Sequence, residues 1–147
     1  MPLEGEYAPT THDEVRAQVE EYEASGGVRG TTVGGLPVVL LTTMGVRSGK
    51  LRKSPVMRVE HEGLYAAVAS RGGEPRHPDW YFNLKAHPHL ELQDGPVKQD
   101  MLAREAEGDE RELWWERAVA AYPGYAEYQT MTTRRIPVFI LERTATP

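Results

Sequence analysis

The chain has 147 residues, of which 39% are apolar, and it carries a formal net charge of −5. This length suits one domain with a sizeable core, so residues 1–147 are expected to fold as a unit. The sequence contains no cysteine, which excludes disulfides, thiolate metal sites and cysteine nucleophiles.

No apolar run approaches the roughly 20 residues that a membrane-spanning helix needs. The N-terminus lacks the basic and apolar regions of a signal peptide, and an acidic chain is repelled by nucleic acid and by anionic lipid. The sequence therefore predicts a cytoplasmic protein with no membrane-spanning segment and no nucleic-acid partner.

The first predicted element is a helix over about residues 12–25. Thr11 and Glu14 have the spacing of a capping box at its start. Apolar residues then recur at helical intervals until Gly26 and Gly27 end the run.

From Leu36 onward, short β-branched segments are separated by turn signals, a pattern typical of antiparallel strands in a meander or barrel. Residues 61–63 and the pair Asp94-Gly95 are expected to form tight turns between paired strands. Six strands suffice to close a small barrel, and the predicted class is α+β. The predicted strands span residues 37–43, 52–60, 64–70, 89–94, 96–105 and 136–142, and two further helices span 78–86 and 109–122.

Charge is unevenly distributed along the chain. Residues 24–59 hold six basic and no acidic residues, so with a total of −5 the other 111 residues sum to −11. Four of these bases lie between Arg47 and Lys53, beside glycines whose backbone N–H groups can approach phosphate oxygens. The segment is not a Walker A loop, because Leu51 stands where a magnesium-binding Ser or Thr is needed. It predicts an anion-binding loop, with a solvated basic hairpin as the alternative.

Two other segments have the composition of a binding site. Residues 69–73, Ala-Ser-Arg-Gly-Gly, combine a small polar residue, a base and two flexible positions, which permits backbone approach to a flat ligand, although an ordinary glycine-rich loop has the same composition. Residues 122–128 contain three phenols that can enclose an aromatic substrate or donate a proton, or else simply pack.

The sequence offers little equipment for other mechanisms. His87 and His89 have no third ligand at a diagnostic interval, so no metal site is predicted. Neither a nucleophile elbow nor a His-Glu-x-x-His helix is present. A bound cofactor is therefore expected to supply the reactive atom.

Taken together and in this order, five motifs resemble those of the deazaflavin-dependent nitroreductase family, which uses coenzyme F420. The resemblance covers about Pro37 to Leu141. It implies a single F420-binding domain, a split β-barrel of about six mainly antiparallel strands with flanking helices. The motifs that carry it are Leu41-Thr42-Thr43-Met44-Gly45-Val46-Arg47-Ser48-Gly49-Lys50-Leu51-Arg52, Ser54-Pro55, residues 68–73, Pro78-Asp79-Trp80-Tyr81-Phe82-Asn83-Leu84 and Tyr122 to Gln129, ending at Arg135 to Val138.

The resemblance implies how F420 is held, since its phosphodiester and oligoglutamate tail are anionic. Arg47, Ser48 and Arg52 would bind the phosphate and nearby tail groups, with two lysines at the rim. Residues 54–57 and 68–71 would flank the deazaflavin ring. The implied cofactor-binding residues are Val46, Arg47, Ser48, Lys50, Arg52, Lys53, Ser54, Pro55, Val56, Met57, Val68, Ala69, Ser70, Arg71, Asp79, Trp80, Asn83 and Tyr125.

The resemblance further implies an oxidoreductase that transfers a hydride from reduced F420 to a small acceptor, a quinone, a nitroaromatic or an activated alkene. Ser70 is the candidate hydrogen-bond donor to the charge that develops on the acceptor, and Tyr125 is the candidate proton donor or positioning group. The expected acceptor pocket comprises Met57, Tyr122, Tyr125 and Tyr128.

The resemblance leaves some properties open. Met57 stands where some relatives have a tyrosine, and the N-terminal segment is acidic, so the preferred acceptor is not fixed. Two alternatives remain: an FMN-dependent split-barrel oxidoreductase and a non-catalytic F420 carrier. The oligomeric state is not predicted.

Overall fold

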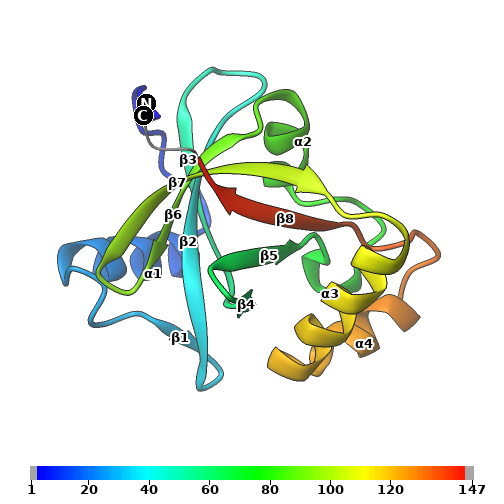
Figure 1. Cartoon of the computed structure of the whole chain (residues 1–147). Coiled ribbons are helices and arrows are strands. Elements are labelled where there is room, and N and C mark those ends of the chain that lie inside the picture. The colour runs from blue at the N-terminus through cyan, green and yellow to red at the C-terminus, as the bar shows by residue number, and fades with distance from the viewer. Residues whose placement is uncertain (1–2, 145–147) are drawn as a thin grey trace.

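In the computed structural model, which describes residues 3–144, the chain forms one sheet of eight strands with helices around it (Figure 1). The strands are β1 (Thr32–Val33), β2 (Leu36–Met44), β3 (Leu51–Met57), β4 (Glu60–His61), β5 (Leu64–Val68), β6 (His89–Asp94), β7 (Val97–Glu105) and β8 (Val138–Arg143). The helices are α1 (Asp13–Ala24), α2 (Asp79–Ala86), α3 (Gly108–Ala121) and α4 (Gly124–Thr130), with a 3-10 turn η1 (Arg71–Gly73).

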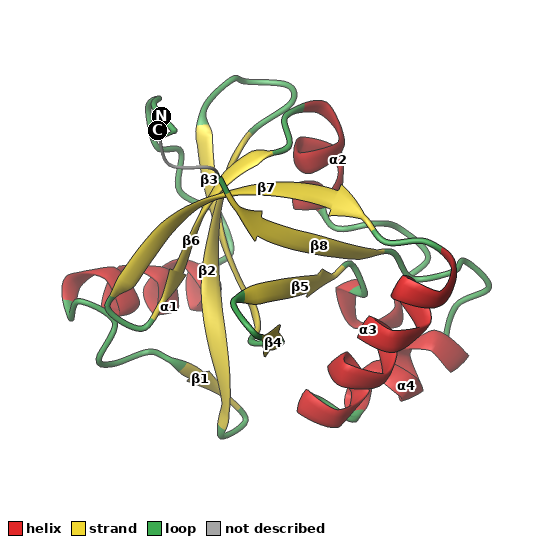
Figure 2. Cartoon of the chain, in the orientation of Figure 1, coloured by secondary structure: helices red, strands yellow, loops and turns green. Residues whose placement is uncertain are grey.

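All pairings between these strands are antiparallel, in the order β1-β2-β6-β7-β8-β5-β4 with β3 also paired to β2. Residues 51–61 connect the two sides of the sheet, because β3 in this segment pairs with β2 whereas β4 pairs with β5. Between them, the N–H of Ala66 donates to the carbonyl of Val59 at 2.9 Å. The sheet therefore curls into a half-barrel whose two sides are joined by residues 51–61 (Figure 2), which confirms the predicted α+β split barrel.

Several predicted boundaries need correction. The strand expected over 52–60 is interrupted at residues 58–59, where the chain leaves β2 for β5. The strand expected over 64–70 ends at Val68, because Ser70 opens the η1 turn. Helix α1 is capped by the ring of His12 instead of Thr11, since Nδ1 accepts the N–H of Val15 at 3.4 Å.

Elements β1 and α4 were not predicted. With two residues, β1 is too short to show alternation, and it is defined by its pairing with the start of β2. Helix α4 has seven residues and begins directly after Pro123. Its length falls below the range in which helical periodicity is recognisable. It places Tyr125 and Tyr128 at the wall of a pocket, which Tyr122 at the C-terminal end of α3 also lines.

Alternate residues of the strands face two different layers. In β2, Val39 and Leu41 belong to the buried cluster inside the barrel, whereas Val38 and Leu40 pack under α1. Strand β8 alternates in the same way between the barrel interior and the helices α3 and α4. Helix α1 therefore covers one side of the barrel, and α3 and α4 cover another (Figure 1).

The chain leaving α1 packs against the β6–β7 turn. The hydroxyl of Tyr22 accepts the N–H of Gly95 at 2.7 Å and lies 3.1 Å from the carbonyl of Gln93. Gly27 has a φ of +80°, and a Cβ at this position would lie 1.9 Å from the carbonyl oxygen of Gly95. Only glycine fits this approach.

We expect Gly27→Ala to lower the free energy of unfolding by about 2–4 kcal/mol, because overpacking and a left-handed backbone both oppose the added methyl. Gly26→Ala is the matched control, since Gly26 has a φ of +67° but no atom within 4 Å of the added Cβ. Its expected loss is about 1–2 kcal/mol, from backbone strain alone. Urea denaturation measures both values, and equal losses would contradict the steric argument.

Candidate active site

A pocket of about 300 Å³ lies between β3, the η1 turn, α2 and α4. It brings together most of the residues expected at the cofactor ring and the acceptor. The predicted residues that line it are Pro55, Val56, Met57, Val68, Ser70, Arg71, Trp80, Tyr122, Tyr125 and Tyr128, and Val33 of the unpredicted β1 also lines it.

Two elements connect this pocket to the basic loop of residues 45–50. Strand β3 runs from Arg52 near the loop to Met57 in the pocket, and at about 3.3 Å per residue these positions lie roughly 16 Å apart. Helix α2 contributes Trp80 to the pocket and Asn83 to the loop. The site is therefore elongated, with a basic end and an aromatic end.

The basic loop is held in shape by its own backbone and by α2. The N–H of Gly45 donates to the carbonyl of Lys50 at 2.8 Å, and the N–H of Gly49 donates to the carbonyl of Gly45 at 2.9 Å. The buried side chain of Asn83 accepts the N–H of Val46 at 3.0 Å and donates to the hydroxyl of Thr43 at 3.1 Å. Asn83 belongs to the predicted cofactor-binding residues, and in the structure its side chain holds the basic loop in place.

Four of the six bases in residues 24–59 have carboxylate partners. The pairs are Arg29 with Glu21, Lys50 with Glu6, Lys53 with Glu23 and Arg58 with Asp94. Arg47 and Arg52 have no such partner among residues 3–144, and both are at least partly exposed. These two guanidinium groups therefore carry the positive charge that remains for an anionic ligand.

The neighbouring bases Arg52 and Lys53 of β3 point to opposite faces of the strand, because strand residues alternate between faces. Arg52 shares a face with Ser54 and Val56, whereas Lys53 faces α1, where it pairs with Glu23 and lies 5.1 Å from the ring centre of Tyr7. The structure thus separates Lys53 from Arg52, although both belong to the predicted cofactor set. Asp79, another member of that set, is exposed in the first turn of α2.

Residues 69–74, which include η1 and are called the Ser70 turn below, present a free hydroxyl to the pocket. This turn follows β5, and the N–H of Ala69 donates to the carbonyl of Pro137 at 2.9 Å. Arg71 has a φ of 45°, in the left-handed region that non-glycine residues rarely occupy. Ser70 is 7% exposed, and its hydroxyl has no partner within residues 3–144. This hydroxyl can therefore donate to a bound molecule.

The three tyrosines form an aromatic wall. The hydroxyls of Tyr122 and Tyr128 lie 2.8 Å apart, and this hydrogen bond raises the pKa of Tyr128 to about 12. The ring of Tyr125 meets that of Tyr122 edge-on, with 4.9 Å between their centres. Burial raises the pKa of Tyr125 above its ordinary value, and in the described part of the chain no protein group bonds its hydroxyl. Tyr125 consequently stays protonated and keeps a free hydroxyl donor.

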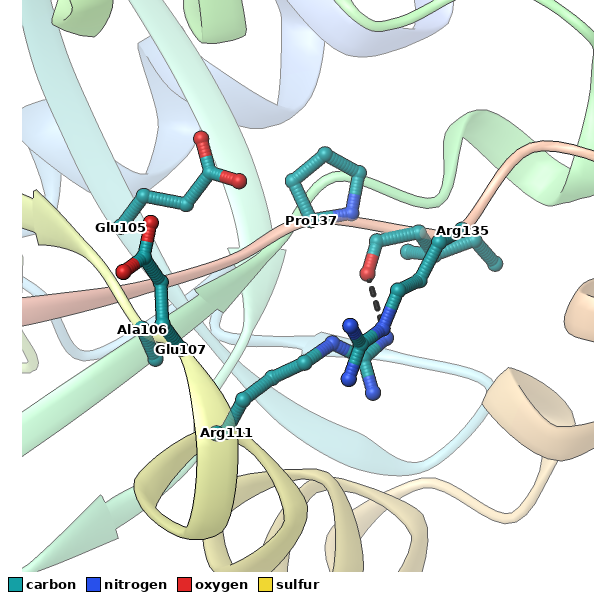
Figure 3. Close-up of a pocket in the computed structure, with 8 residues that line it drawn as sticks. Glu105, Ala106, Glu107, Arg111, Arg135 and Pro137 are labelled. Carbon is teal, nitrogen blue, oxygen red and sulfur yellow. Dashed lines mark hydrogen bonds between the residues drawn. The ribbon is translucent and has the colours of Figure 1, made fainter.

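A second cavity of about 330 Å³ lies where β7 leads into α3 (Figure 3). Buried Arg111 donates to the carbonyl of Ile136 at 2.7 Å, and Arg135 pairs with Glu112 on the outside. Burial and the charge of Arg135 lower the pKa of Arg111. None of the predicted site residues lines this cavity, and Arg111 serves to join α3 to the start of β8.

Two further features concern the whole described chain. Within residues 3–144, no three His, Cys, Asp or Glu side chains gather as a metal site would require. No helix in the same range has the length and apolar character needed to cross a bilayer.

Known proteins match this chain over most of its length. The model of the F420H(2)-dependent quinone reductase family matches residues 14–143. The F420H(2)-dependent quinone reductase of Mycobacterium tuberculosis is 34% identical over 126 residues, which cover 83% of this chain and 85% of that protein.

Two solved structures are also similar. The F420H2-dependent reductase FDR-A is 62% identical with a TM-score of 0.69, over 72% of this chain and 94% of that one. A protein described as a domain-swapped dimer is 55% identical with a TM-score of 0.72, over 90% of this chain and 100% of that one.

Proposed function

We propose that this chain, which belongs to the F420H(2)-dependent quinone reductase family, reduces a quinone in the pocket between Ser70 and the α4 tyrosines. Members of this family are oxidoreductases, and their hydride donor is reduced coenzyme F420. When bound, the reduced deazaflavin supplies the hydride. The chain's own residues bind, orient and shield the reactants.

The observation that carries the proposal is the match between the two ends of the site and the two parts of F420. At one end, Arg47 and Arg52 lack carboxylate partners among the described residues, which suits a phosphodiester and an anionic tail. At the other end, Trp80 and Val56 line a pocket suited to a flat ring. The remaining predicted cofactor contacts are also part of this proposal. They lie in the basic loop with Lys50 at its rim, along β3, at the end of β5 and in the Ser70 turn, and in α2 and α4.

Ser70 and Tyr125 supply hydrogen-bond donors where the acceptor gains negative charge. A quinone oxygen becomes anionic as the ring accepts a hydride, and preorganised donors in a partly dry pocket stabilise that charge. Since burial raises the pKa of Tyr125, this phenol is a weak acid and a persistent donor. Tyr122 and Tyr128 bond to each other and act as walls.

The same donors suit other electron-poor acceptors. A nitroaromatic and an activated alkene also develop negative charge on oxygen or on a conjugated group during hydride transfer. We therefore extend the proposal to these compounds as secondary acceptors, with Met57 and the three tyrosines in contact with them.

Parallel absorbance titrations with F420 and FMN test the cofactor assignment. We expect F420 to bind at least tenfold more tightly, since two unpaired arginines suit a ligand with several anionic groups. Tighter binding of FMN would favour the FMN-dependent alternative.

Anaerobic mixing of the F420H2-loaded protein with a naphthoquinone, a nitroaromatic and an activated alkene tests the acceptor class. Oxidation of F420H2 by the quinone in a single turnover is expected. If the protein binds F420H2 tightly but none of the three compounds oxidises the bound F420H2, the protein is a carrier.

A further inference from the structure

The Ser70 turn has an unusual backbone conformation. It contains left-handed backbone at Arg71, Gly72 and Gly73, with φ values of 45°, 64° and 82°. Its own backbone supplies two hydrogen bonds, from the N–H of Gly73 to the carbonyl of Ser70 and from the N–H of Glu74 to the carbonyl of Arg71. Glycine adopts this conformation readily, but at Arg71 it is strained and persists only where the surroundings over-determine it.

One side chain from outside the turn contacts it at several points. The guanidinium of Arg134 donates to the carbonyl of Ala69 at 3.0 Å, to that of Ser70 at 2.8 Å and to that of Glu74 at 3.0 Å. It also lies 3.1 Å from Nδ1 of His77, which must accept the bond because arginine only donates. One planar cation thus binds the turn at both ends.

Arg134 is in turn fixed to the helix that carries the tyrosines. The side-chain amide of Gln129, in α4, donates to the carbonyl of Arg134 at 2.8 Å and accepts the N–H of Ile136 at 3.0 Å. In addition, a Cβ on Gly73 would lie 2.9 Å from the carbonyl oxygen of Tyr128, so the turn and α4 are in close contact. The Ser70 turn and the tyrosines on the opposite side of the pocket are therefore connected by hydrogen bonds through residues 129–136.

We propose that Arg134 is a positioning residue, which together with Gln129 sets the Ser70 turn against α4 and so fixes the distance between the two hydrogen-bond donors of the pocket. The inference rests on the proposed function, because it gives the turn a role in hydride transfer. Arg134 touches backbone carbonyls and His77, and it does not line the pocket.

The adjacent Arg135 provides a matched control. Arg135 carries the same charge as Arg134 and lies in the same loop, but its side chain is exposed and pairs with Glu112 instead of contacting the turn. Arg134→Ala and Arg135→Ala therefore change the net charge equally. Arg134→Lys is a milder variant, since a single ammonium cannot reach all four acceptors at once.

The first measurement needs no cofactor. Hydrogen exchange of the unliganded protein should show the amides of residues 73–74 exchanging at least tenfold faster in Arg134→Ala than in Arg135→Ala, with Arg134→Lys between them. Circular dichroism checks that each variant is folded. Unchanged exchange in a folded Arg134→Ala protein would overturn the inference.

The second measurement is the rate of single-turnover oxidation of F420H2 at saturating quinone. Displacing a preorganised donor costs on the order of tenfold to a thousandfold in rate, so we expect at least a tenfold loss in Arg134→Ala and less than twofold in Arg135→Ala. Added guanidinium at millimolar concentration should restore part of the Arg134→Ala rate and leave the Arg135→Ala rate unchanged.

The two proposals fail in different ways. Wild-type protein that neither binds F420 nor oxidises F420H2 would contradict the proposed function, while the exchange measurement would still report on the contacts between Arg134 and the Ser70 turn. Active wild-type protein with equal rates in the two alanine variants would overturn the role of Arg134 alone.

Discussion

Replacing both Arg47 and Arg52 by alanine is expected to weaken F420 binding by about a hundredfold or more. Each charge-assisted contact to the phosphodiester or tail need contribute only about 1.4 kcal/mol to account for a tenfold change, and two contacts on separate elements should add. Calorimetric titration of the single and double variants at low salt measures the effect. Wild-type affinity should also fall as salt rises, because both groups are exposed enough to be screened.

Arg29→Ala is the control for net charge, since Arg29 already pairs with Glu21 of α1. The affinity of Arg29→Ala for F420 should match that of the wild type within about twofold, a much smaller effect than the tenfold change expected for Arg47→Ala or Arg52→Ala. A deazaflavin without phosphodiester and tail gives a second control, because its binding should not distinguish the double variant from the wild type. Unchanged affinity of the double variant for F420 would mean that the basic loop is only a solvated hairpin.

The sequence predicts the location of the basic end of the site but not which bases remain available. The segregation of charge over residues 24–59 is visible in the sequence, and it predicts that the anion-binding loop lies at residues 45–50. The partners of Lys53 and Arg58, however, lie 30 and 36 residues away along the chain. Such ion pairs depend on which strand face meets which helix, and this is decided only when the barrel closes.

The residues that support the site are less predictable than those that line it. Ser70 and the tyrosines stand out because their composition suits a ligand. Gln129 ends one of the motifs and Arg134 lies just before the next, but neither was predicted to support the site, because both act by hydrogen bonds to main-chain groups. Long-range bonds between a side chain and a main chain leave no periodic signal.

The second large effect is expected at Tyr125. Tyr125→Phe keeps the ring and removes the hydroxyl, so F420 affinity should remain near that of the wild type while the rate of quinone reduction falls by about tenfold to a hundredfold. Tyr122→Phe is the matched control, because the hydroxyl of Tyr122 bonds to Tyr128 rather than remaining free for the acceptor. Its loss should be smaller. Stopped-flow oxidation of F420H2 compares the two variants under identical conditions.

The pH dependence and an alanine variant distinguish a hydroxyl donor from a wall. Since burial raises the pKa of Tyr125 above its ordinary value of 10.0, the protonated phenol persists as the pH rises through 10, and ionisation of this group should not lower the wild-type rate there. If water supplies the proton and Tyr125 only shapes the pocket, Tyr125→Phe would keep its rate while Tyr125→Ala would lose activity through the space left beside Tyr122. Near-wild-type rates in both variants would remove Tyr125 from the site.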